Sequence, residues 1–299
     1  MIQLVNFVLT LVSLGLYWFW GRVRIRRYVL GQSEIEGDRF AYHGTGKELL
    51  IGFFKVTLLF GIPLALISTF LPALLGEAAA QTILVILGYA IGLFFWPYAM
   101  VSARRYRLSR TSWRGIRFSF RGPAGPFVRL FARGSILTTV TLGLYYPIFD
   151  VSRQHYLVSH SWFGSRRFWF DGEGSDLFRP FVVAVLLTIP TLGLSWFWYV
   201  ARRRRYVWDH TGLDQARFRC TVRGGPLLLL WVVNAILIVI TLGLARPWVR
   251  VRNIAFAFAN LSLVGPVDLA AIQQEWSRVS ATGEGLAGLF DSDTGFDFG

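Results

Sequence analysis

The stretch Gly44-Thr45-Gly46-Lys47 is the part of this chain that most resembles a phosphate-binding motif. A loop that cradles phosphates has a glycine five residues before its Gly-Lys pair and a serine or threonine after it. Ala41 and Glu48 occupy those two positions here. The sequence therefore argues against a nucleotide site.

Metal and thiol chemistry have equally little support. The histidines are His43, His155, His160 and His210, and the nearest pair, His155 and His160, is five residues apart, whereas ligands on one helix face are three or four apart. His160 and His210 hold the same place in an internal repeat of the chain, which favours a helix-end role. Cys220 is the only cysteine, which excludes an intramolecular disulfide. We predict no catalytic residue, no cofactor and no metal.

Ionisable residues inside apolar segments often mark transport pathways. Lys55 is the one charge well inside an apolar stretch, close to the end of that stretch. The middle of each apolar run lacks acidic residues, which argues against proton coupling but not against a channel.

The elements that would carry any site are apolar and basic. Of 299 residues, 54% are hydrophobic and the net charge is +14. The basic residues are almost all arginine and lie beside apolar runs, so anionic lipid headgroups are the expected partner and nucleic acid is not. Uncharged runs cover residues 1–20, 56–76, 78–103, 134–149, 180–201 and 224–245. Because a membrane-spanning helix needs ~20 apolar residues, we expect about six transmembrane helices.

The internal repeat, of about 50 residues, organises the chain. Its landmarks are a glycine, usually in Thr-Leu-Gly-Leu, an aromatic residue 13 or 14 positions later, and the phenylalanine of an Arg-Phe pair 12 positions after that. The glycines are Gly15, Gly92, Gly143, Gly193 and Gly243; the tyrosines are Tyr28, Tyr106, Tyr156 and Tyr206; the phenylalanines are Phe40, Phe118, Phe168 and Phe218.

Each copy reads as an apolar span, a basic helix at headgroup depth and a short β-hairpin with an aromatic face. The predicted fold is an all-α polytopic membrane protein. A repeat-built domain covers residues 1–265, and an acidic, partly flexible tail covers 266–299, where a protein partner could bind. The copies lie near 1–48, 77–124, 125–176, 177–225 and 226–265, with an extra span near 49–75.

Two topologies are consistent with this repeat. If every run crosses once, successive basic segments alternate between the two sides of the membrane. The Lys and Arg counts of the five post-helix regions, 6, 9, 4, 7 and 3, favour this alternation under the positive-inside rule. If Thr-Leu-Gly-Leu instead closes a re-entrant helical hairpin, all copies share one face. We predict alternation.

The chain resembles a bacterial inner-membrane family typified by YjgN, a domain of unknown function. The residues that carry the resemblance are Thr-Leu-Gly-Leu-Tyr-Tyr-Pro at 141–147, the basic stretch 202–211, the stretch 39–49 and the tail 282–291. The resemblance implies a multi-pass protein of the bacterial cytoplasmic membrane and supplies no substrate or catalytic residue. Asp150 departs from the pattern of the other copies.

The functional prediction is a non-enzymatic membrane protein whose basic, aromatic segments contact anionic lipid or a partner. A transporter or channel for a small solute is the alternative, because transporters are often built from repeats. The sequence indicates no oligomeric state. The predicted headgroup contacts are Arg22, Arg26, Arg27, Arg104, Arg105, Arg202, Arg203, Arg204 and Arg205.

Overall fold

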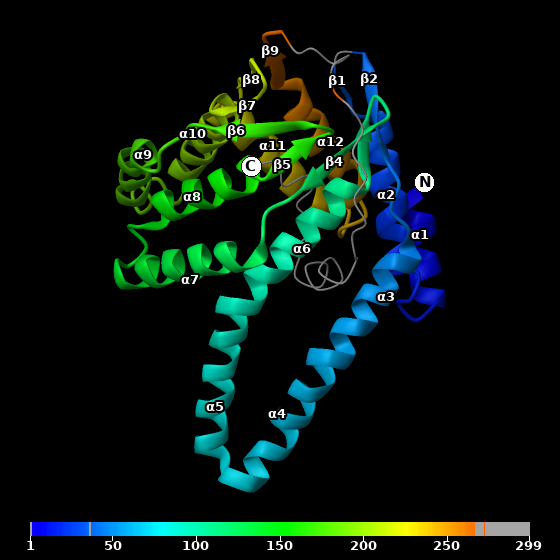
Figure 1. Cartoon of the computed structure of the whole chain (residues 1–299), viewed down its shortest axis with the longest axis vertical. Coiled ribbons are helices and arrows are strands. Elements are labelled where there is room, and N and C mark those ends of the chain that lie inside the picture. Colours follow the sequence, from blue (N-terminus) through cyan, green and yellow to red (C-terminus); the bar gives the residue numbers. More distant parts are fainter. Residues whose placement is uncertain (1, 36, 267–271, 273–299) are drawn as a thin grey trace. The chain divides into compact units, whose positions relative to one another are not determined.

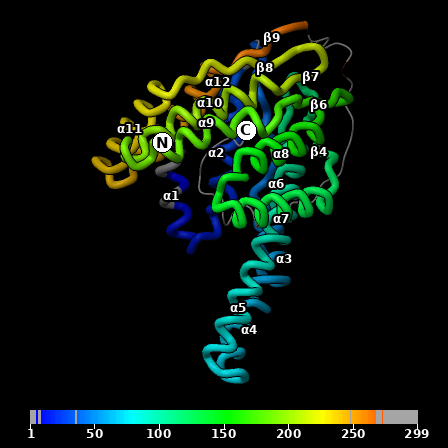
Figure 2. The backbone as a smooth tube through the Cα atoms, turned by 90° about the vertical axis from the view of Figure 1, so that its left-hand side faces the viewer, coloured from blue at the N-terminus to red at the C-terminus, as the bar shows by residue number. Residues whose placement is uncertain are grey.

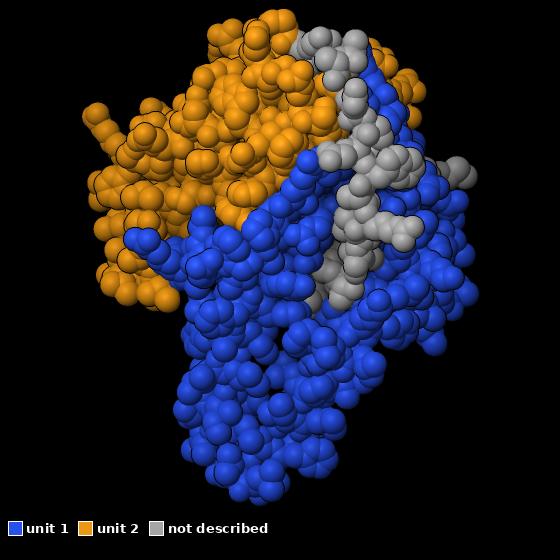
Figure 3. Space-filling model, in the orientation of Figure 1, with its two compact units in different colours: residues 1–31, 40–135, 276–291 blue, residues 32–39, 136–275, 292–299 orange. Residues whose placement is uncertain are grey.

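A computed structural model of the chain describes residues 2–35, 37–266 and 272. The chain divides into two compact units (Figure 3). The described part of unit 1 is residues 2–31 and 40–135, and that of unit 2 is residues 32–35, 37–39, 136–266 and 272.

Unit 1 combines helices with a three-stranded antiparallel ladder. Its helices are α1 (Ile2–Val12), α2 (Trp18–Gln32), α3 (Gly46–Val56), α4 (Ile62–Leu75), α5 (Glu77–Ala90), α6 (Trp96–Ser109) and α7 (Ala124–Val140), the last of which continues into unit 2. Its strands are β3 (Thr111–Trp113), β4 (Ile116–Phe120) and residues 40–42 of β2 (Asp38–Tyr42). The first two residues of β2 pair with the two-residue β1 (Glu34–Ile35), and these residues belong to unit 2. Phe40 pairs with Trp113 and Trp113 with Ile116, so β3 is the central strand.

Two long apolar helices connect β2 to β3. Single-turn π-helical segments, η1 (Thr57–Gly61) and η2 (Ile91–Phe95), join α3 to α4 and α5 to α6. The continuous helices Gly46–Leu75 and Glu77–Ser109 have 30 and 33 residues, or about 45 and 50 Å at 1.5 Å per residue. They meet at Gly76, whose φ is +79°, and in Figure 1 they diverge from there toward α3 and α6; Figure 2 shows the same hairpin from the side. We call Gly46–Ser109 the long hairpin.

Unit 2 repeats an order of helix, two strands and helix. Its elements are α8 (Tyr146–Ser159), β5 (Ser161–Phe163), β6 (Arg166–Phe170), α9 (Ser175–Leu186), α10 (Ser195–Asp209), β7 (Thr211–Leu213), β8 (Ala216–Cys220), α11 (Gly224–Ile240), α12 (Arg246–Ala259) and β9 (Leu261–Val264). The five strands form one antiparallel ladder in chain order.

The helical connections of unit 2 all begin and end at the same end of its ladder. Two-residue turns join β5 to β6 and β7 to β8, whereas α9–α10 connects β6 to β7 and α11–α12 connects β8 to β9. Because neighbouring strands are antiparallel, the tight turns lie at one end of the strands and both helical connections leave from the other. The α9–α10 and α11–α12 hairpins, called the short hairpins, therefore have their bases on the same side of the ladder.

The short hairpins reverse direction in what we call leucine turns, at residues 191–194 and 241–244. Related turns join α1 to α2 at 13–16 and α7 to α8 at 141–144. In the 191–194 turn, the Gly193 N–H donates to the Thr188 carbonyl at 2.7 Å and the Leu192 N–H to the Ile189 carbonyl at 3.2 Å. This pair of bonds is a Schellman C-cap. Leucine rather than the usual glycine occupies the left-handed position, at φ +50° for Leu192.

A hydroxyl at the start of each leucine turn explains where the chain turns back. The Thr191 Oγ1 accepts from the Ser195 N–H at 3.2 Å, and the Thr141 Oγ1 accepts from the Tyr145 N–H at 3.0 Å. The residue two before Gly92 is Ala90, which has no hydroxyl. Gly92 lies inside η2 and has no positive φ, so the helix continues there. At each of the four positions where the repeated glycine lies in a turn, a hydroxyl two residues earlier accepts from the backbone N–H four residues after it.

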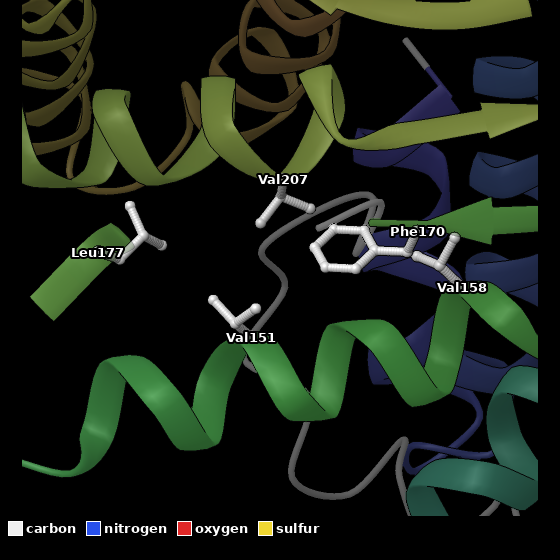
Figure 4. Packing of buried hydrophobic residues seen from close by; sticks show 5 residues of the cluster. All are labelled: Val151, Val158, Phe170, Leu177 and Val207. Atoms are coloured by element: carbon white, nitrogen blue, oxygen red, sulfur yellow. The ribbon is translucent and has the colours of Figure 1, made fainter. Parts of the chain in front are cut away.

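The core of unit 2 lies between helices and the ladder (Figure 4). Val151 and Val158 of α8, Phe170 of β6, Leu177 of α9 and Val207 of α10 form one buried cluster. The Phe170 ring lies between α8 and α10, which packs both helices on the strand that precedes α9. The ladder thus provides the surface on which the hairpin bases are fixed.

Two fold predictions are wrong. The protein is not an all-α bundle of about six spans, because the strands form antiparallel ladders and only two helices among the described residues are long and apolar enough to cross a membrane. The physical reason is the leucine turn, which folds the apolar run 180–201 into two short helices. Alternation fails as well, because Phe168 of β6 pairs with Leu213 of β7, and successive β-hairpins joined in this way cannot lie on opposite sides of a membrane.

The acidic tail prediction concerns residues 266–299. Apart from residues 266 and 272, that segment lies outside the described residues.

Candidate lipid-contact site

The base of the long hairpin is closed by a tyrosine and a carboxylate. Tyr106, whose side chain is fully buried on α6, donates from its hydroxyl to the Glu48 Oε2 of α3 at 2.6 Å, and Arg110 donates to the Glu48 Oε1. Glu48 is also the third residue of a capping box with Thr45, which begins α3. The Gly-Thr-Gly-Lys stretch weighed as a phosphate loop therefore has a helix-starting role.

The α9–α10 hairpin has the same closure at its base. The Tyr206 hydroxyl of α10 donates to the Asp176 Oδ2 of α9 at 2.6 Å and accepts from the Glu173 N–H at 2.6 Å. Burial and the hydrogen bond to Asp176 raise the pKa of Tyr206. Tyr106 and Tyr206 thus join the outgoing helix of each hairpin to the returning one.

Two landmark tyrosines lie against the histidine four residues later. The ring centroids of Tyr156 and His160 are 4.2 Å apart, and those of Tyr206 and His210 are 4.0 Å apart. The landmark tyrosine Tyr28 is 48% exposed. His160 and His210 each place Nδ1 at 2.8 Å from the backbone oxygen four residues earlier, at the C-terminal caps of α8 and α10. The predicted helix-end role of these two histidines is confirmed.

A buried ion pair joins α8 to α10. Asp150 is 1% exposed and accepts from Arg153 Nη2 at 2.8 Å and from Arg203 Nη2 at 2.9 Å, with a second bond from Arg203 Nε. Burial by itself would lower the pKa of Arg203, but the hydrogen bonds and charge of Asp150 outweigh it and raise that pKa. Arg203, predicted as a headgroup contact, is therefore held by a carboxylate.

Sequence reasoning missed the partner of Asp150. The signal was available, because Asp150 is an acid where equivalent positions hold Met100, Val200 and Arg250. A lone acid at such a place needs a buried cation, and Arg203 lies in the next copy. Nearby, the Tyr199 hydroxyl is buried and has no hydrogen-bond partner among the described residues.

Several predicted arginines make internal contacts in unit 1. Arg22 lies over the Trp18 ring at 4.2 Å, and Arg26 contacts Tyr42. Arg105 donates to the Gly122 carbonyl at 2.7 Å, and Arg27 reaches the equivalent Gly44 carbonyl at 3.4 Å while its side chain stays exposed. These arginines fix the end of the second strand to the preceding helix.

The remaining predicted arginines differ in exposure. Arg104 and Arg204 are half-buried, and desolvation, followed by the charge of Arg203, lowers the pKa of Arg204. Arg202 and Arg205 are exposed. Being three positions apart, they share one face of α10. The structure therefore places two neighbouring cations of this set at the surface of the α9–α10 hairpin.

The landmark phenylalanines line one face of each ladder. Phe40 stacks with Trp113 at 6.1 Å and with Phe118 at 6.3 Å, and Phe168 stacks with Phe218 at 6.4 Å between ring centroids. Among the described residues, no group of three or more His, Cys, Asp or Glu side chains could hold a metal ion.

Together, outward-facing apolar helices and basic hairpin bases define a membrane protein. Only 11% and 6% of the most apolar windows of the two long helices are buried, unlike the core helices of soluble proteins. The chain belongs to the family described as "Bacterial protein of unknown function (DUF898)", which matches residues 1–194 and 182–289. It is a YjgN-like protein of the bacterial inner membrane.

Curated relatives carry the same localisation in their names. The chain is 32% identical over 119 residues to the "Inner membrane protein YjgN" of Salmonella typhimurium, and 31% identical over 121 residues to that of Escherichia coli strain K12. Each match covers 40% of this chain and 28% of the relative, so the aligned part spans under a third of the relatives' length. No solved structure matches the chain.

Proposed function

We propose that this protein is a non-enzymatic membrane protein whose exposed arginines bind anionic phospholipid headgroups. The observation that carries the proposal is the position of Arg202 and Arg205 on α10. They follow Gly193 of the leucine turn by nine and twelve residues, or about 14 and 18 Å along the helix. One leaflet of a ~30 Å hydrocarbon core is about 15 Å thick. A hairpin whose turn reaches the bilayer centre would thus present both guanidinium groups to phosphates.

Arginine chemistry suits this role. A guanidinium group donates two parallel hydrogen bonds to a phosphate and is more weakly hydrated than an ammonium group. The exposed Trp198, on the same helix and 53% exposed, lies between the turn and the arginines. By the same proposal, the α1–α2, α7–α8 and α11–α12 hairpins are further copies of one lipid-facing unit.

Transport of a small solute is supported less well. Between residues 49 and 103 of the long hairpin, the charged residues are Lys55 and Glu77, and both are exposed rather than directed into the helix pair. Above the base closed by Tyr106 and Glu48, the contacts described between the two helices are aromatic and aliphatic, such as Phe60 against Phe95 with ring centroids 4.2 Å apart. A lipid-binding role therefore accounts for more of the structure than a solute pathway does.

The test is retention of lipid by the full chain. Native mass spectrometry of protein released from membranes containing phosphatidylglycerol should show fewer bound anionic lipids for Arg202→Gln/Arg205→Gln than for the unchanged protein. The control is Arg166→Gln/Arg217→Gln, which removes the half-buried Arg166 and the exposed Arg217, both ion-paired near the tight turns of the ladder. Equal retention by both double variants would contradict the proposal.

A further inference from the structure

The leucine turns carry side chains that are almost fully exposed. Leu192 is 93% exposed, and its counterparts Leu14, Leu142 and Leu242 are 94–95% exposed. All four adopt φ values between +49° and +51°. A left-handed conformation costs a non-glycine residue about 1–2 kcal/mol. The same strained, outward-pointing leucine at four turns indicates that something apolar receives it.

The surface around Leu192 is apolar as well. Leu186 is 71% exposed, Ile189 is 85% exposed, and Leu194 is 46% exposed. No charged residue occurs between residues 180 and 201. Transfer of one exposed leucine side chain from water to an apolar phase is worth about 1.5–3 kcal/mol, which exceeds or matches the backbone cost.

The backbone of the 191–194 turn satisfies its own donors. The N–H groups of residues 191 to 194 donate to backbone carbonyls of Leu187, Ile189, Thr188 and Thr191, at 3.0–3.2 Å except for 2.7 Å at Gly193. The Ser195 N–H donates to the Thr191 Oγ1. The Thr191 and Thr188 hydroxyls donate in turn to carbonyls one helical turn earlier. An unsatisfied polar group costs several kcal/mol in hydrocarbon, so this turn is suited to a medium without water.

From these observations we infer that the leucine turns insert among the acyl chains of one leaflet and turn back inside the membrane. The helices of the α9–α10 hairpin have 12 and 15 residues, or about 18 and 22 Å, too short to cross a ~30 Å hydrocarbon core. Both short hairpins leave the same end of the ladder in unit 2, so they enter from the same side.

The insertion depth differs between the two short hairpins. Arg246 is exposed and follows Gly243 by three residues, whereas no charge follows Gly193 for eight residues. An arginine about 5 Å from the turn must keep its head near water. The 241–244 turn therefore lies shallower than the 191–194 turn, which provides an internal comparison.

Site-directed spin labelling measures this depth. In a Cys220→Ala background, nitroxide labels are placed at Leu192→Cys, Leu242→Cys and Gln215→Cys, and the full chain is reconstituted in phosphatidylethanolamine–phosphatidylglycerol vesicles. Gln215 is exposed in the tight turn between β7 and β8, at the opposite end of the ladder. The label at Leu192 should collide with oxygen and almost lose its collisions with the water-soluble Ni-EDDA complex. The label at Leu242 should show intermediate values, and the label at Gln215 should remain fully accessible to Ni-EDDA.

Ni-EDDA accessibility at Leu192 equal to that at Gln215 would overturn the inference. The labels replace exposed side chains, and the Gln215 variant gives the Ni-EDDA accessibility of a water-exposed position on the same ladder. This result is separate from the arginine proposal: a buried Leu192 label with unchanged lipid retention in Arg202→Gln/Arg205→Gln leaves the insertion intact and removes the headgroup role. A water-exposed Leu192 label together with reduced lipid retention in Arg202→Gln/Arg205→Gln removes the insertion and leaves the headgroup role intact.

Discussion

The long hairpin of unit 1 and the α9–α10 hairpin of unit 2 begin alike and end differently. Each connects two neighbouring strands, and each is closed at its base by a tyrosine hydroxyl on a carboxylate, Tyr106 on Glu48 and Tyr206 on Asp176. The long hairpin then continues through the π-helical segment η1 to Gly76 and returns through η2. The α9–α10 hairpin reverses at Gly193 instead.

The comparison shows that hairpin length depends on few residues at the turn. A base of the same kind carries either a pair of helices about 45–50 Å long or a pair about 18–22 Å long. What differs is whether the glycine is preceded by a hydroxyl and adopts a positive φ, as at Gly193, or follows Ala90 and stays helical, as at Gly92. Apolar content alone does not show whether a segment forms one long helix or folds back into two short ones.

The largest effect is expected from the ion pair that holds the α9–α10 hairpin against α8. Asp150→Ala leaves Arg203 and Arg153 without their buried carboxylate and should destabilise unit 2 by about 3–5 kcal/mol. The control is Asp171→Ala, which removes an exposed pair with Arg217 and should cost at most about 1 kcal/mol. Thermal unfolding in detergent followed by circular dichroism measures both. Similar melting temperatures for the two variants would refute a special role for Asp150.

The shared hairpin base is tested by removing one hydroxyl at a time. Tyr106→Phe should lower the free energy of unfolding by about 1.5–3 kcal/mol, because the hydroxyl is buried and bonds to a charged carboxylate. Tyr206→Phe should cost less, about 0.5–1.5 kcal/mol, because water can reach the partly exposed bond to Asp176. Chemical unfolding curves give the free energies of unfolding of the two variants. An unchanged free energy of unfolding in Tyr106→Phe would contradict the role of this hydroxyl in closing the long hairpin.

A matched pair of glycine substitutions tests the difference at the turns. Gly193→Ala forces a Cβ into φ +83° and should cost about 1–2 kcal/mol. Gly92→Ala lies in a helical segment with open space around it, so alanine should be neutral or stabilising by up to about 1 kcal/mol. A lower melting temperature for Gly193→Ala and an unchanged or higher one for Gly92→Ala would support a turn at Gly193 and a continuous helix at Gly92. Equal decreases in melting temperature would indicate that the chain turns at both glycines.

The smallest expected effect concerns His43, just before the long hairpin. Burial, followed by the charges of Arg117, Arg27 and Arg110, lowers the pKa of His43 below 6.5. The unfolded chain therefore binds a proton at a higher pH than the folded chain does. The contribution to stability is complete above pH 6.5 and is lost as the pH falls through the folded-state pKa. A His43→Gln variant should lose stability less steeply than the unchanged protein below pH 6.5.

The sequence was sufficient to locate the helical segments, the aromatic strands and the membrane character of the chain. Hydrophobic runs and the period-two Arg-Phe segments depend on local residue order, which is why they could be read directly. The Arg-Phe pairs at Phe168 and Phe218, for example, are expected in short hairpins, and they lie in β6 and β8. The family resemblance from residues 141–147 and 202–211 led to the correct localisation.

The topology and most arginine contacts could not be read in this way. The apolar run 180–201 has the length of one span, and only the hydroxyl and glycine of its turn show that it folds back. The pairing of Phe168 with Leu213, which excludes alternation, joins residues 45 positions apart. The contact between Arg203 and Asp150 likewise depends on how α10 packs against α8. Charge counts on isolated segments contain no information about such contacts.

We propose that the long hairpin, whose two helices are long and apolar enough to span a bilayer, crosses the membrane, while the α9–α10 hairpin returns within it. Accessibility of single cysteines to a membrane-impermeant maleimide in intact spheroplasts tests it most directly, in a Cys220→Ala background. Glu77→Cys at the tip of the long hairpin should react, and Arg114→Cys in the β3–β4 turn should react only after permeabilisation, because the basic base is expected in the cytoplasm. Leu192→Cys should react under neither condition. Labelling of Leu192→Cys in intact spheroplasts, as at Glu77→Cys, would contradict the account.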